Sequence, residues 1–513
     1  MTNKFVTKTF CLIVTTLLLI AVAAFPATAY ATEVVNPSQS PRMITVSLYG
    51  DTKTQMAFTW NTVQYAGSDV LIVEKSATGG FQSHSVITAS GTTTKSTVQG
   101  DGYVHRVVAS NLKPATEYVY KVGDVELNNW SEQGSFTTSG KSAFTFLHVS
   151  DPQAYESLYY ENYGRMLSSA SQLYNFAFVA LTGDIVNNSW EGRTPQLEQW
   201  DWALTDRFDF MGHTPVAAVA GNHEAATDDF YSRFTYDVPE GSDTSTGCYY
   251  SFNYGNAHFT CINTNDTTNK ASSDAPGLSE NQYNWIKADL AASSNAQWKI
   301  VLMHKGIYDS GDHSQNADTG DGREDYDIEK IRLQLAPLFT EYGVDLVLQG
   351  HDHLYSKSAP IVAKIQGGEL TETADEQPQM RKIGSSQVET YLSPRGTTYL
   401  NSGSASGSKY YTPNSGYNPN LIVKTNNPNT LMYTAITVDG NSLLVSTYTM
   451  DNDFNSVHYY SFAILHEGVA GGGLLAWQIA LIVVGATLSA AGIVTCAIVL
   501  AKKSKRKNNS TVA

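Results

Sequence analysis

Aspartate, asparagine and histidine residues recur directly after short apolar runs in this 513-residue sequence. Five such clusters follow one another along the chain: Asp151-Pro152-Gln153, Gly183-Asp184, Gly221-Asn222-His223-Glu224, His304, and Gly350-His351-Asp352-His353. A single Asp in such a place is commonly a helix cap or a turn residue, and a single His is commonly structural. Five clusters in series, with two histidines one residue apart, instead indicate a metal site. Mixed oxygen and imidazole ligands suit Mn, Fe or Zn.

The apolar runs before these clusters are typical of buried strands, and amphipathic segments separate them. We expect strands at 144–149, 176–182, 216–220, 299–303 and 345–349, and helices at 159–174, 196–210, 280–292 and 328–342. This alternation predicts an α/β layered fold, in which ligands gather beyond the carboxyl ends of the strands. Further strands at 431–438 and 443–448 predict a second sheet that packs on the first.

Residues 43–138 have a different rhythm, with short alternating segments separated by turn residues. This spacing predicts a β-sandwich, which we place at residues 36–139. It carries no evident catalytic cluster, so we interpret it as a spacer or a binding module. Trp60 and Tyr118 are expected to be core and corner residues and not ligands.

Both ends of the sequence indicate export and membrane anchoring. Residues 1–31 have the basic start, apolar run and small-x-small site of a signal peptide. Residues 474–501 are long and apolar enough to form a transmembrane helix. The basic residues of the tail, 502–513, predict that this tail stays in the cytoplasm. We therefore expect a single-pass protein of the cell membrane whose large domain is extracytoplasmic.

The charge balance excludes some classes of partner. The sequence has 33 Lys and Arg residues and 48 Asp and Glu residues. Two of the basic residues lie in the signal peptide and five in the tail, so the remainder carries a net charge of about −22. Such a surface repels polyanions, and no nucleic-acid partner is expected. A small phosphorylated substrate held by metal ions stays possible, because bound cations dominate the local field.

Of the four cysteines, only Cys248 and Cys261 lie outside the signal peptide and the predicted membrane helix. Export permits a disulfide between them. They flank a predicted hairpin that turns near Gly255-Asn256, which would place them diagonally opposite one another. The sequence leaves open whether they are bridged.

Taken together, the five clusters resemble the signature of the calcineurin-like metallophosphoesterase family. Residues 41–138 resemble the fibronectin-like N-terminal domain of purple acid phosphatases, and the segment 249–259 is also similar to that group. The resemblance covers roughly residues 36–465. It implies an α/β/β/α two-sheet sandwich at residues 141–466, a centre of two metal ions, and hydrolysis of phosphate esters.

Carried over position by position, the resemblance implies two ligand sets. Asp151, Asp184 and His353 would hold one metal, with Gln153 as a further candidate. The second metal would be held by Asp184, Asn222, His304 and His351. Asp184 would then bridge two cations, about 4 Å apart, that hold both ends of an in-line displacement and generate hydroxide near neutral pH.

The resemblance also implies roles for two further histidines. His223 would face the substrate, where it could stabilise developing charge or protonate the leaving group; a hydrogen bond to a ligand is the alternative role. His313 lies in the polar loop after His304, where relatives place substrate-facing histidines, although this loop is equally consistent with a solvated segment. Glu224 is expected to orient a neighbour.

Two residues depart from the family pattern. Asn187 stands three positions after Asp184, where the purple enzymes have a tyrosine, so no purple colour is expected from iron-loaded protein. Gln153 stands where many relatives outside the purple group have a histidine, so this position offers at best a neutral amide oxygen.

We therefore expect a cell-surface phosphomonoesterase of the acid phosphatase type that uses two metal ions. A phosphodiesterase or nucleotidase on the same scaffold is the near alternative, because loops decide the substrate. A surface adhesion protein with an inactive phosphoesterase domain is an alternative of a different class. The completeness of the ligand set argues against it.

Overall fold

The computed structural model of the chain describes residues 37–140, 143–187, 195–225, 229–268, 277–315, 326–383 and 386–467. The predicted signal peptide (1–31), membrane helix (474–501) and basic tail (502–513) lie outside these residues. In the part of the chain that is described, no helix has both the length and the apolar character needed to cross a membrane.

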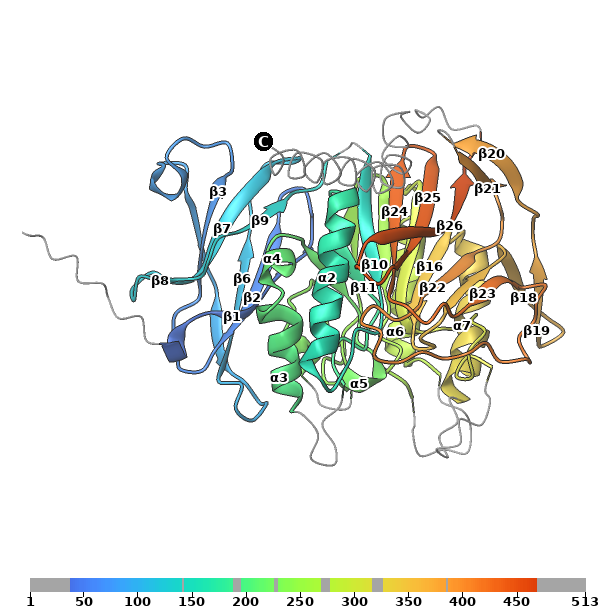
Figure 1. Ribbon diagram of the computed structural model, residues 1–513, viewed down its shortest axis with the longest axis horizontal. Coiled ribbons are helices and arrows are strands. Elements are labelled where there is room, and N and C mark those ends of the chain that lie inside the picture. Colours follow the sequence, from blue (N-terminus) through green and yellow to red (C-terminus); the bar gives the residue numbers. More distant parts are fainter. Residues whose placement is uncertain are drawn as a thin grey trace, which may run out of the picture. The chain divides into compact units, whose positions relative to one another are not determined.

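Twelve of the described strands form one mixed sheet (Figure 1). In spatial order they are β20 (Gln379–Ile383), β21 (Ser386–Leu392), β26 (Ser456–Leu465), β25 (Ser442–Met450), β24 (Met432–Asp439), β10 (Phe144–Val149), β11 (Val179–Leu181), β12 (Val216–Ala218), β1 (Arg42–Ser47), β2 (Met56–Thr62), β6 (Tyr103–Ala109) and β5 (Thr92–Lys95). Strands β10, β11 and β12 are parallel neighbours. The segments that follow them, with Asp151, Asp184 and Asn222, therefore leave the sheet at one edge.

Seven described strands form a second sheet. In spatial order they are β13 (Tyr250–Tyr254), β14 (Ala257–Cys261), β15 (Trp298–Lys305), β16 (Leu346–Gly350), β22 (Thr398–Ser402), β17 (Tyr355–Ser358) and β23 (Ile422–Asn426). Strands β14, β15, β16 and β22 pair in parallel. His304 lies at the end of β15, and His351 and His353 follow β16, so a single edge of this sheet carries the imidazoles.

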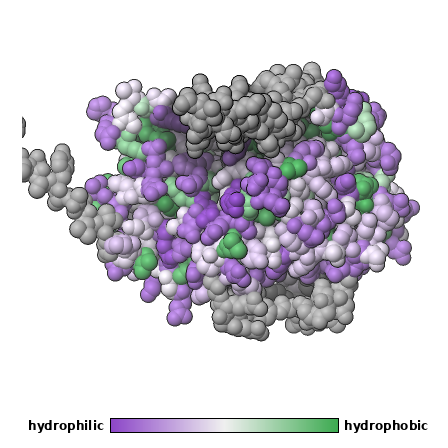
Figure 2. Space-filling model, in the orientation of Figure 1, coloured by the Kyte–Doolittle hydropathy of each residue, from purple (hydrophilic) through white to green (hydrophobic). Residues whose placement is uncertain are grey.

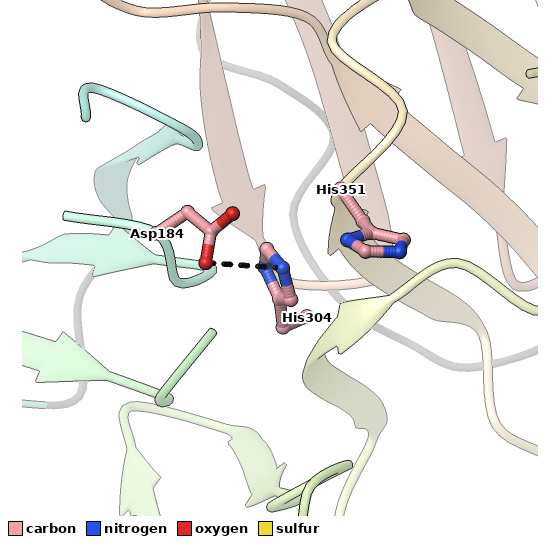
Figure 3. Close-up of side chains that lie close together, drawn as sticks. All are labelled: Asp184, His304 and His351. Carbon is pink, nitrogen blue, oxygen red and sulfur yellow. Dashed lines mark ion pairs between the residues drawn. The ribbon is translucent and has the colours of Figure 1, made fainter. Parts of the chain in front are cut away.

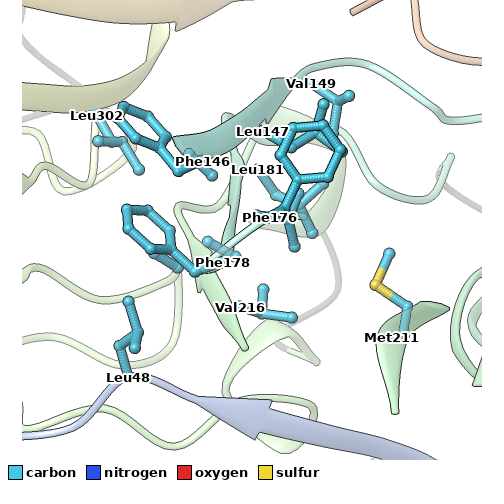
Figure 4. Close-up of a cluster of buried hydrophobic side chains, with 14 of the residues drawn as sticks. Leu48, Phe146, Leu147, Val149, Phe176, Phe178, Leu181, Met211, Val216 and Leu302 are labelled. Carbon is cyan, nitrogen blue, oxygen red and sulfur yellow. The ribbon is translucent and has the colours of Figure 1, made fainter. Parts of the chain in front are cut away.

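Aromatic side chains form the contact between the two sheets. Phe146 and Phe178 of the first sheet meet Phe259 of the second, with ring centroids 5.4 and 5.3 Å away. All three rings are fully buried, and Leu302 lies beside Phe146 in the same cluster (Figure 4). Burial of each such ring contributes roughly 1.5–3 kcal/mol. This packing holds the two ligand-bearing edges against each other.

Helices cover the outer faces of both sheets. Helix α2 (Ser157–Leu173) runs along the first sheet beside β10 and β11 (Figure 1). It buries Tyr160, Tyr163, Met166, Leu167 and Ala170 at helical spacing. Helices α6 (Glu280–Ala292) and α7 (Tyr326–Tyr342) pack on the second sheet through a separate apolar cluster that includes Ile286, Leu290, Leu335 and Phe339. The structure thus has the layers helix, sheet, sheet, helix. Strands β18 (Ile361–Gln366) and β19 (Glu369–Ala374) form a hairpin of their own.

The single helix expected at 196–210 is interrupted, so this prediction is wrong in part. Helix α3 (Gln196–Trp200) continues into a π-helical segment, η3 (Asp201–Thr205), and a separate α4 (Phe208–Met211) follows. The side chains of the interruption bond to β1: Arg42 donates to Asp201 at 2.7 Å, and the Met43 amide donates to Thr205 at 2.9 Å. Tertiary contacts of this kind override the helical propensity of the segment.

The N-terminal region is a β-sandwich, as predicted. One of its sheets contains β3 (Asp69–Glu74), β4 (Ile87–Ser90), β7 (Glu117–Asp124), β8 (Asn129–Trp130) and β9 (Gly134–Thr137). Trp60 and Tyr118 are buried in its core. The Tyr118 hydroxyl accepts a hydrogen bond from the Lys113 amide at 2.9 Å, which is the geometry of a tyrosine corner. Both residues are therefore structural, as the sequence predicted.

The other sheet of the sandwich is continuous with the catalytic sheet, which the sequence did not predict. Strand β1 pairs in parallel with β12 at Ser47 and Val216, and the Leu48 amide donates to the Val216 carbonyl. The described residues between Ser38 and Glu467 form one compact unit. The N-terminal region is thus an integral extension of the first sheet and not a separate spacer.

A buried ion pair reinforces this junction. Arg233, which is fully buried, donates to both carboxylate oxygens of Asp101 at 2.9 and 3.0 Å. Asn61 and Ser96 also donate to Asp101, and Arg42 lies 3.7 Å from it. Asp101 belongs to the N-terminal region and Arg233 to the catalytic region, so the pair joins the two.

Cys248 and Cys261 are both buried and both free. In the hairpin of β13 and β14, the residue opposite Cys261 is Tyr250. Cys248 lies two residues before Tyr250, so the two cysteines are not directly opposite one another. The structure therefore does not contain the disulfide that the sequence left open, and the diagonal placement is the physical reason.

The face of the molecule in Figure 2 is mainly hydrophilic, with apolar residues in small, scattered groups. Isolated apolar side chains are normal on soluble surfaces. The described part of this view thus contains no large apolar patch.

We predict that Asp101→Asn destabilises the protein by about 3 kcal/mol, because it leaves the buried Arg233 guanidinium without a counter-charge. Urea denaturation of the purified protein measures this change. Lys75→Met is the control, since its ion pair with Glu117 is largely exposed and should matter little. If Asp101→Asn and Lys75→Met have equal stability, the buried pair does not hold the junction.

Candidate metal centre

Two groups of buried side chains at the carboxyl edges of the sheets have the arrangement of metal ligands. Asp184, His304 and His351 form one group, and Asp151, Asp184 and His353 form the other. Within each group the potential ligand atoms lie within 4.8 Å of one another. Asp184 belongs to both groups. Figure 3 shows its carboxylate facing the His304 ring, with His351 beside them.

The His304 ring is oriented by the backbone. Its Nδ1 lies 2.8 Å from the Thr182 carbonyl oxygen, which can only accept a hydrogen bond. Nδ1 therefore carries the proton, and Nε2 presents a lone pair. That atom lies 3.0 Å from Asn222 Oδ1 and 3.4 Å from Asp184 Oδ1. Three electron-pair donors thus converge on one point.

The other group is held from the side of β10. His353 Nε2 lies 3.6 Å from Asp151 Oδ1. The Asp151 carboxylate also accepts hydrogen bonds from the Ser150 hydroxyl and the His351 amide. Burial, and then the charge of Asp184, raise the pKa of Asp151. The two carboxylates therefore repel each other unless a positive charge lies between them.

Four of these candidate ligands have an unusual backbone conformation. The φ angles are 54° at Asp151, 48° at Asp184, 78° at His351 and 31° at His353. Side chains other than glycine rarely adopt positive φ, and such strain concentrates at functional sites. The turns after β10, β11 and β16 therefore direct these side chains at an energetic cost that the surrounding packing offsets.

Asp184 is fixed by a second acidic residue. The Glu224 carboxylate accepts hydrogen bonds from the amides of Asp184 at 3.0 Å, Val186 at 2.9 Å and Gly221 at 2.7 Å. Burial, and then the charge of Asp184, raise the pKa of Glu224 to about 8. A Cβ atom on Gly221 would lie 2.0 Å from Asp184 Oδ1, so only glycine fits there. Glu224 orients its neighbours, as the sequence analysis expected.

Histidines surround the charge on Asp184. Burial raises the pKa of Asp184, but its interactions with the neighbouring His304, His223 and His351 outweigh that effect, and the pKa lies well below its usual range. This low pKa favours the ionised form of the carboxylate. An ionised, shared and buried carboxylate is the ligand that two neighbouring cations require.

His223 lies beside Asp184 but differs from the other histidines in its exposure. Its Nε2 is 3.8 Å from Asp184 Oδ2, and its amide donates to Asp184 Oδ1 at 3.1 Å. Its side chain is 18% exposed, whereas that of His304 is fully buried. His223 is thus at the border between the ligand groups and solvent, where a substrate could reach it.

These donor groups fit metal ions. The lone pairs of His304, Asn222 and Asp184 converge without a proton between them. Gln153 Oε1 is buried without a hydrogen-bond partner among the described residues. A cation satisfies converging lone pairs of this kind. Asp151, Asp184 and His353 would hold one ion, and Asp184, Asn222, His304 and His351 the other.

Comparison with known families agrees with this geometry. A profile of the calcineurin-like phosphoesterases matches residues 144–355, and one of the N-terminal domain of purple acid phosphatases matches residues 41–138. Residues 144–355 are a calcineurin-like phosphoesterase domain. The chain is accordingly a metal-dependent phosphoesterase.

Relatives of this phosphoesterase include acid phosphatases. It is 25% identical over 392 residues to acid phosphatase type 7 of Danio rerio, which covers 71% of this chain and 78% of that protein. It is also 25% identical to purple acid phosphatase 15 of Arabidopsis thaliana, over 50% of each chain.

Solved structures share its fold. The purple acid phosphatase from yellow lupin seeds superposes with a TM-score of 0.60 and 19% identity, over 84% of this chain and 75% of that one. PhoD superposes with a TM-score of 0.59 and 14% identity, over 83% of this chain and 91% of that one. At these identities the likeness concerns the fold alone.

Gln153 of the phosphoesterase lies among the ligands, where the sequence analysis placed it as a candidate. Its amide nitrogen is 2.8 Å from Asp184 Oδ2 and 3.2 Å from His353 Nε2. Atoms around one metal ion are separated by similar distances, and rotation of the amide by half a turn would present Oε1 instead. Gln153 can thus complete the group of Asp151, Asp184 and His353.

Asn187, the other departure from the family pattern, is buried, and its amide donates to Gln199 at 2.6 Å.

His313 comes close to the ligands of the phosphoesterase. Its ring centroid is 4.3 Å from that of His351. The Asp352 carboxylate, between the two histidines of its cluster, accepts hydrogen bonds from the His313 and Ser314 amides and from the Ser314 hydroxyl. This anchor places the loop after His304 beside the metal centre.

Two residues near the site were not predicted from the sequence. The ring of Tyr411 lies 4.8 Å from that of His353, and the charge of Lys409 acts on both Asp184 and Asp151. They follow β22 in a segment rich in Gly and Ser. The same signal that indicated the metal ligands could have indicated these two residues. That signal is polar residues shortly after a buried strand of a parallel sheet, and this segment follows such a strand.

We predict that Gln153→His tightens metal binding by about tenfold, because imidazole is the better ligand for Mn, Fe and Zn. Gln153→Leu, which keeps the size but removes both polar atoms, should weaken it. Titration of the metal-free protein against a chelator measures both affinities. Identical affinities in all three proteins would show that Gln153 lies outside the ligand shell.

Proposed function

We propose that the chain is a phosphomonoesterase that works with two metal ions. The observation that carries this proposal is the sharing of one buried carboxylate, Asp184, by two groups of candidate metal ligands. Two cations held by these groups would supply the positive charge that activates water and stabilises an in-line displacement at phosphorus. The ligand chemistry fits Mn, Fe or Zn, and Asn187 offers no tyrosinate that would single out ferric iron.

The residues of the chain divide the remaining work. Asp184 keeps the two cations together because its negative charge offsets their repulsion. His223, at the exposed border of the site, is placed to give a proton to the leaving alkoxide. His313, beside His351, is placed to contact the substrate.

The relatives support a monoester substrate, since several carry the name acid phosphatase. Hydrolysis of a monoester, a diester and a nucleotide by the metal-loaded protein would decide among the substrates. An inactive adhesion protein is disfavoured, because every position of both ligand groups has kept a residue able to bind metal.

We further propose that residues 474–501 anchor the enzyme in the cell membrane, with its catalytic region outside the cell. Residues 1–31 would be removed during export. The support is the sequence of these segments. The full-length protein should sediment with membranes and be cleaved by protease added to intact cells, whereas a chain ending at Glu467 should be released. Recovery of the full-length protein in the soluble fraction would contradict the anchor.

Two substitutions test the mechanism. Asp184→Asn removes the shared charge, so we predict the loss of bound metal and of activity together. His223→Ala should keep both metal ions and lower turnover by about 10² to 10⁴. Elemental analysis and steady-state kinetics measure these quantities. His213→Ala, which changes an exposed histidine outside both ligand groups, is the control.

A series of monoesters with different leaving groups then separates two roles of His223. A good leaving group needs little protonation, so the loss in His223→Ala should shrink along the series. A uniform loss would remove His223 from the acid role. Full activity of Asp184→Asn would contradict the two-metal mechanism itself.

A further inference from the structure

The segment from Gly403 to Tyr411 forms a further wall of the metal centre. It follows β22, which pairs in parallel with β16 (Figure 1), so it leaves the second sheet at the edge that carries His351 and His353. Its first half is bonded to the turn after β10. The Ala405 amide donates to the Ser150 carbonyl at 3.0 Å, and the Ser404 hydroxyl donates to the Asp151 carbonyl at 3.4 Å.

The second half of this segment is anchored on both sides of Lys409. The Ser408 hydroxyl donates to the carbonyl of Gln153. The Tyr411 amide donates to the carbonyl of His353 at 3.4 Å, and its ring lies against the His353 ring. Ser408 and Tyr411, on either side of Lys409, thus contact Gln153 and His353. These contacts place Lys409 beside the ligand group of Asp151, Asp184 and His353.

Lys409 itself makes no hydrogen bond or ion pair among the described residues, although its side chain is mostly removed from solvent. Burial lowers its pKa, and the negative charges of Asp184 and Asp151 oppose that effect. A cation in such a place loses hydration without a direct partner in return, which is costly.

A structural role explains this placement poorly. A lysine that only stabilised the fold would pair with Asp151 or Asp184, and no such pair is formed. A positive charge beside cation ligands also opposes metal binding, so Lys409 does not serve as a metal-binding residue. An anion that occupies the site together with the metal ions would give the ammonium its missing partner.

The phosphoryl group of the substrate is such an anion. A phosphate monoester carries about two negative charges above its second pKa of about 6, whereas a diester carries one. A lysine ammonium acts as a point charge on phosphate. Its attraction therefore grows with the charge of the phosphoryl group.

We propose that Lys409 binds a non-bridging oxygen of the substrate phosphoryl group and thereby selects monoester dianions over diester monoanions. This inference rests on the proposed function, because it assigns a specificity residue to the same site. Lys409 would act on substrate and not on metal, so its loss should leave the metal centre filled.

The first test measures binding without catalysis. Inorganic phosphate is titrated at pH 8 into metal-loaded wild-type protein, Lys409→Met and Lys409→Arg. Lys409→Met should bind phosphate about 10- to 100-fold more weakly, the range for a hydrogen bond to a charged group, with unchanged metal content. Lys409→Arg should recover most of the affinity. Lys364→Met is the control, since it removes the same charge from an exposed position on β18.

The second test compares two esters with the same leaving group, p-nitrophenyl phosphate and methyl p-nitrophenyl phosphate. Lys409→Met should lower kcat/KM for the monoester by about the same factor as phosphate binding and lower that for the diester by a clearly smaller factor. An equal loss on both esters, unchanged phosphate binding, or loss of metal from Lys409→Met would each overturn the inference.

The two proposals fail separately. If wild-type protein hydrolyses neither ester but binds phosphate through Lys409, the proposed function is wrong and the assignment of Lys409 stands. If wild-type protein hydrolyses the monoester and Lys409→Met does so equally well, the proposed function stands and the assignment of Lys409 is wrong.

Discussion

The carboxylate of Asp184 has to remain charged in a place that water does not reach. Burial alone would protonate it, and the neighbouring Asp151 adds repulsion. Histidines on three sides, together with the amide of His223, oppose protonation. Most features of the site follow from this requirement. Glu224 holds the turn that carries Asp184, Gly221 leaves room for its oxygen, and the strained turns direct Asp151, His351 and His353 toward it.

Such a concentration of like-charged and polar groups is tolerable only where several secondary-structure elements end together. The parallel strands β10, β11 and β12 deliver the oxygen ligands, and β15 and β16 of the other sheet deliver the imidazoles. Neither sheet could form the centre alone. The apolar contact of Phe146 and Phe178 with Phe259 therefore has a direct chemical consequence, because it sets the separation between the carboxylates and the imidazoles.

The sequence predicted those parts of the fold that depend on local pattern. Strand β10 and helix α6 have the predicted bounds, and the five clusters come together, because strand ends and helical periodicity are visible in single segments. Contacts between distant segments were not visible. The interruption at Asp201, the pairing of Ser47 with Val216 and the buried pair of Asp101 and Arg233 all depend on residues far apart in the chain. Lys409 was missed for a related reason, since only the pairing of β22 with β16 brings its segment to the site.

The junction of β1 with β12 has a consequence for how the chain reaches its folded state. Without β1, the short strand β12 would be the open edge of the catalytic sheet, with unpaired backbone groups next to a fully apolar sequence, and such edges promote aggregation. During synthesis, however, β1 emerges long before β12 exists, so β1 must remain partnered by β2 alone until the catalytic strands arrive. Pairings between segments so distant in sequence close slowly. The N-terminal region therefore protects the catalytic sheet from pairing with other molecules. Until β1 joins β12, the nascent protein remains open to such intermolecular pairing.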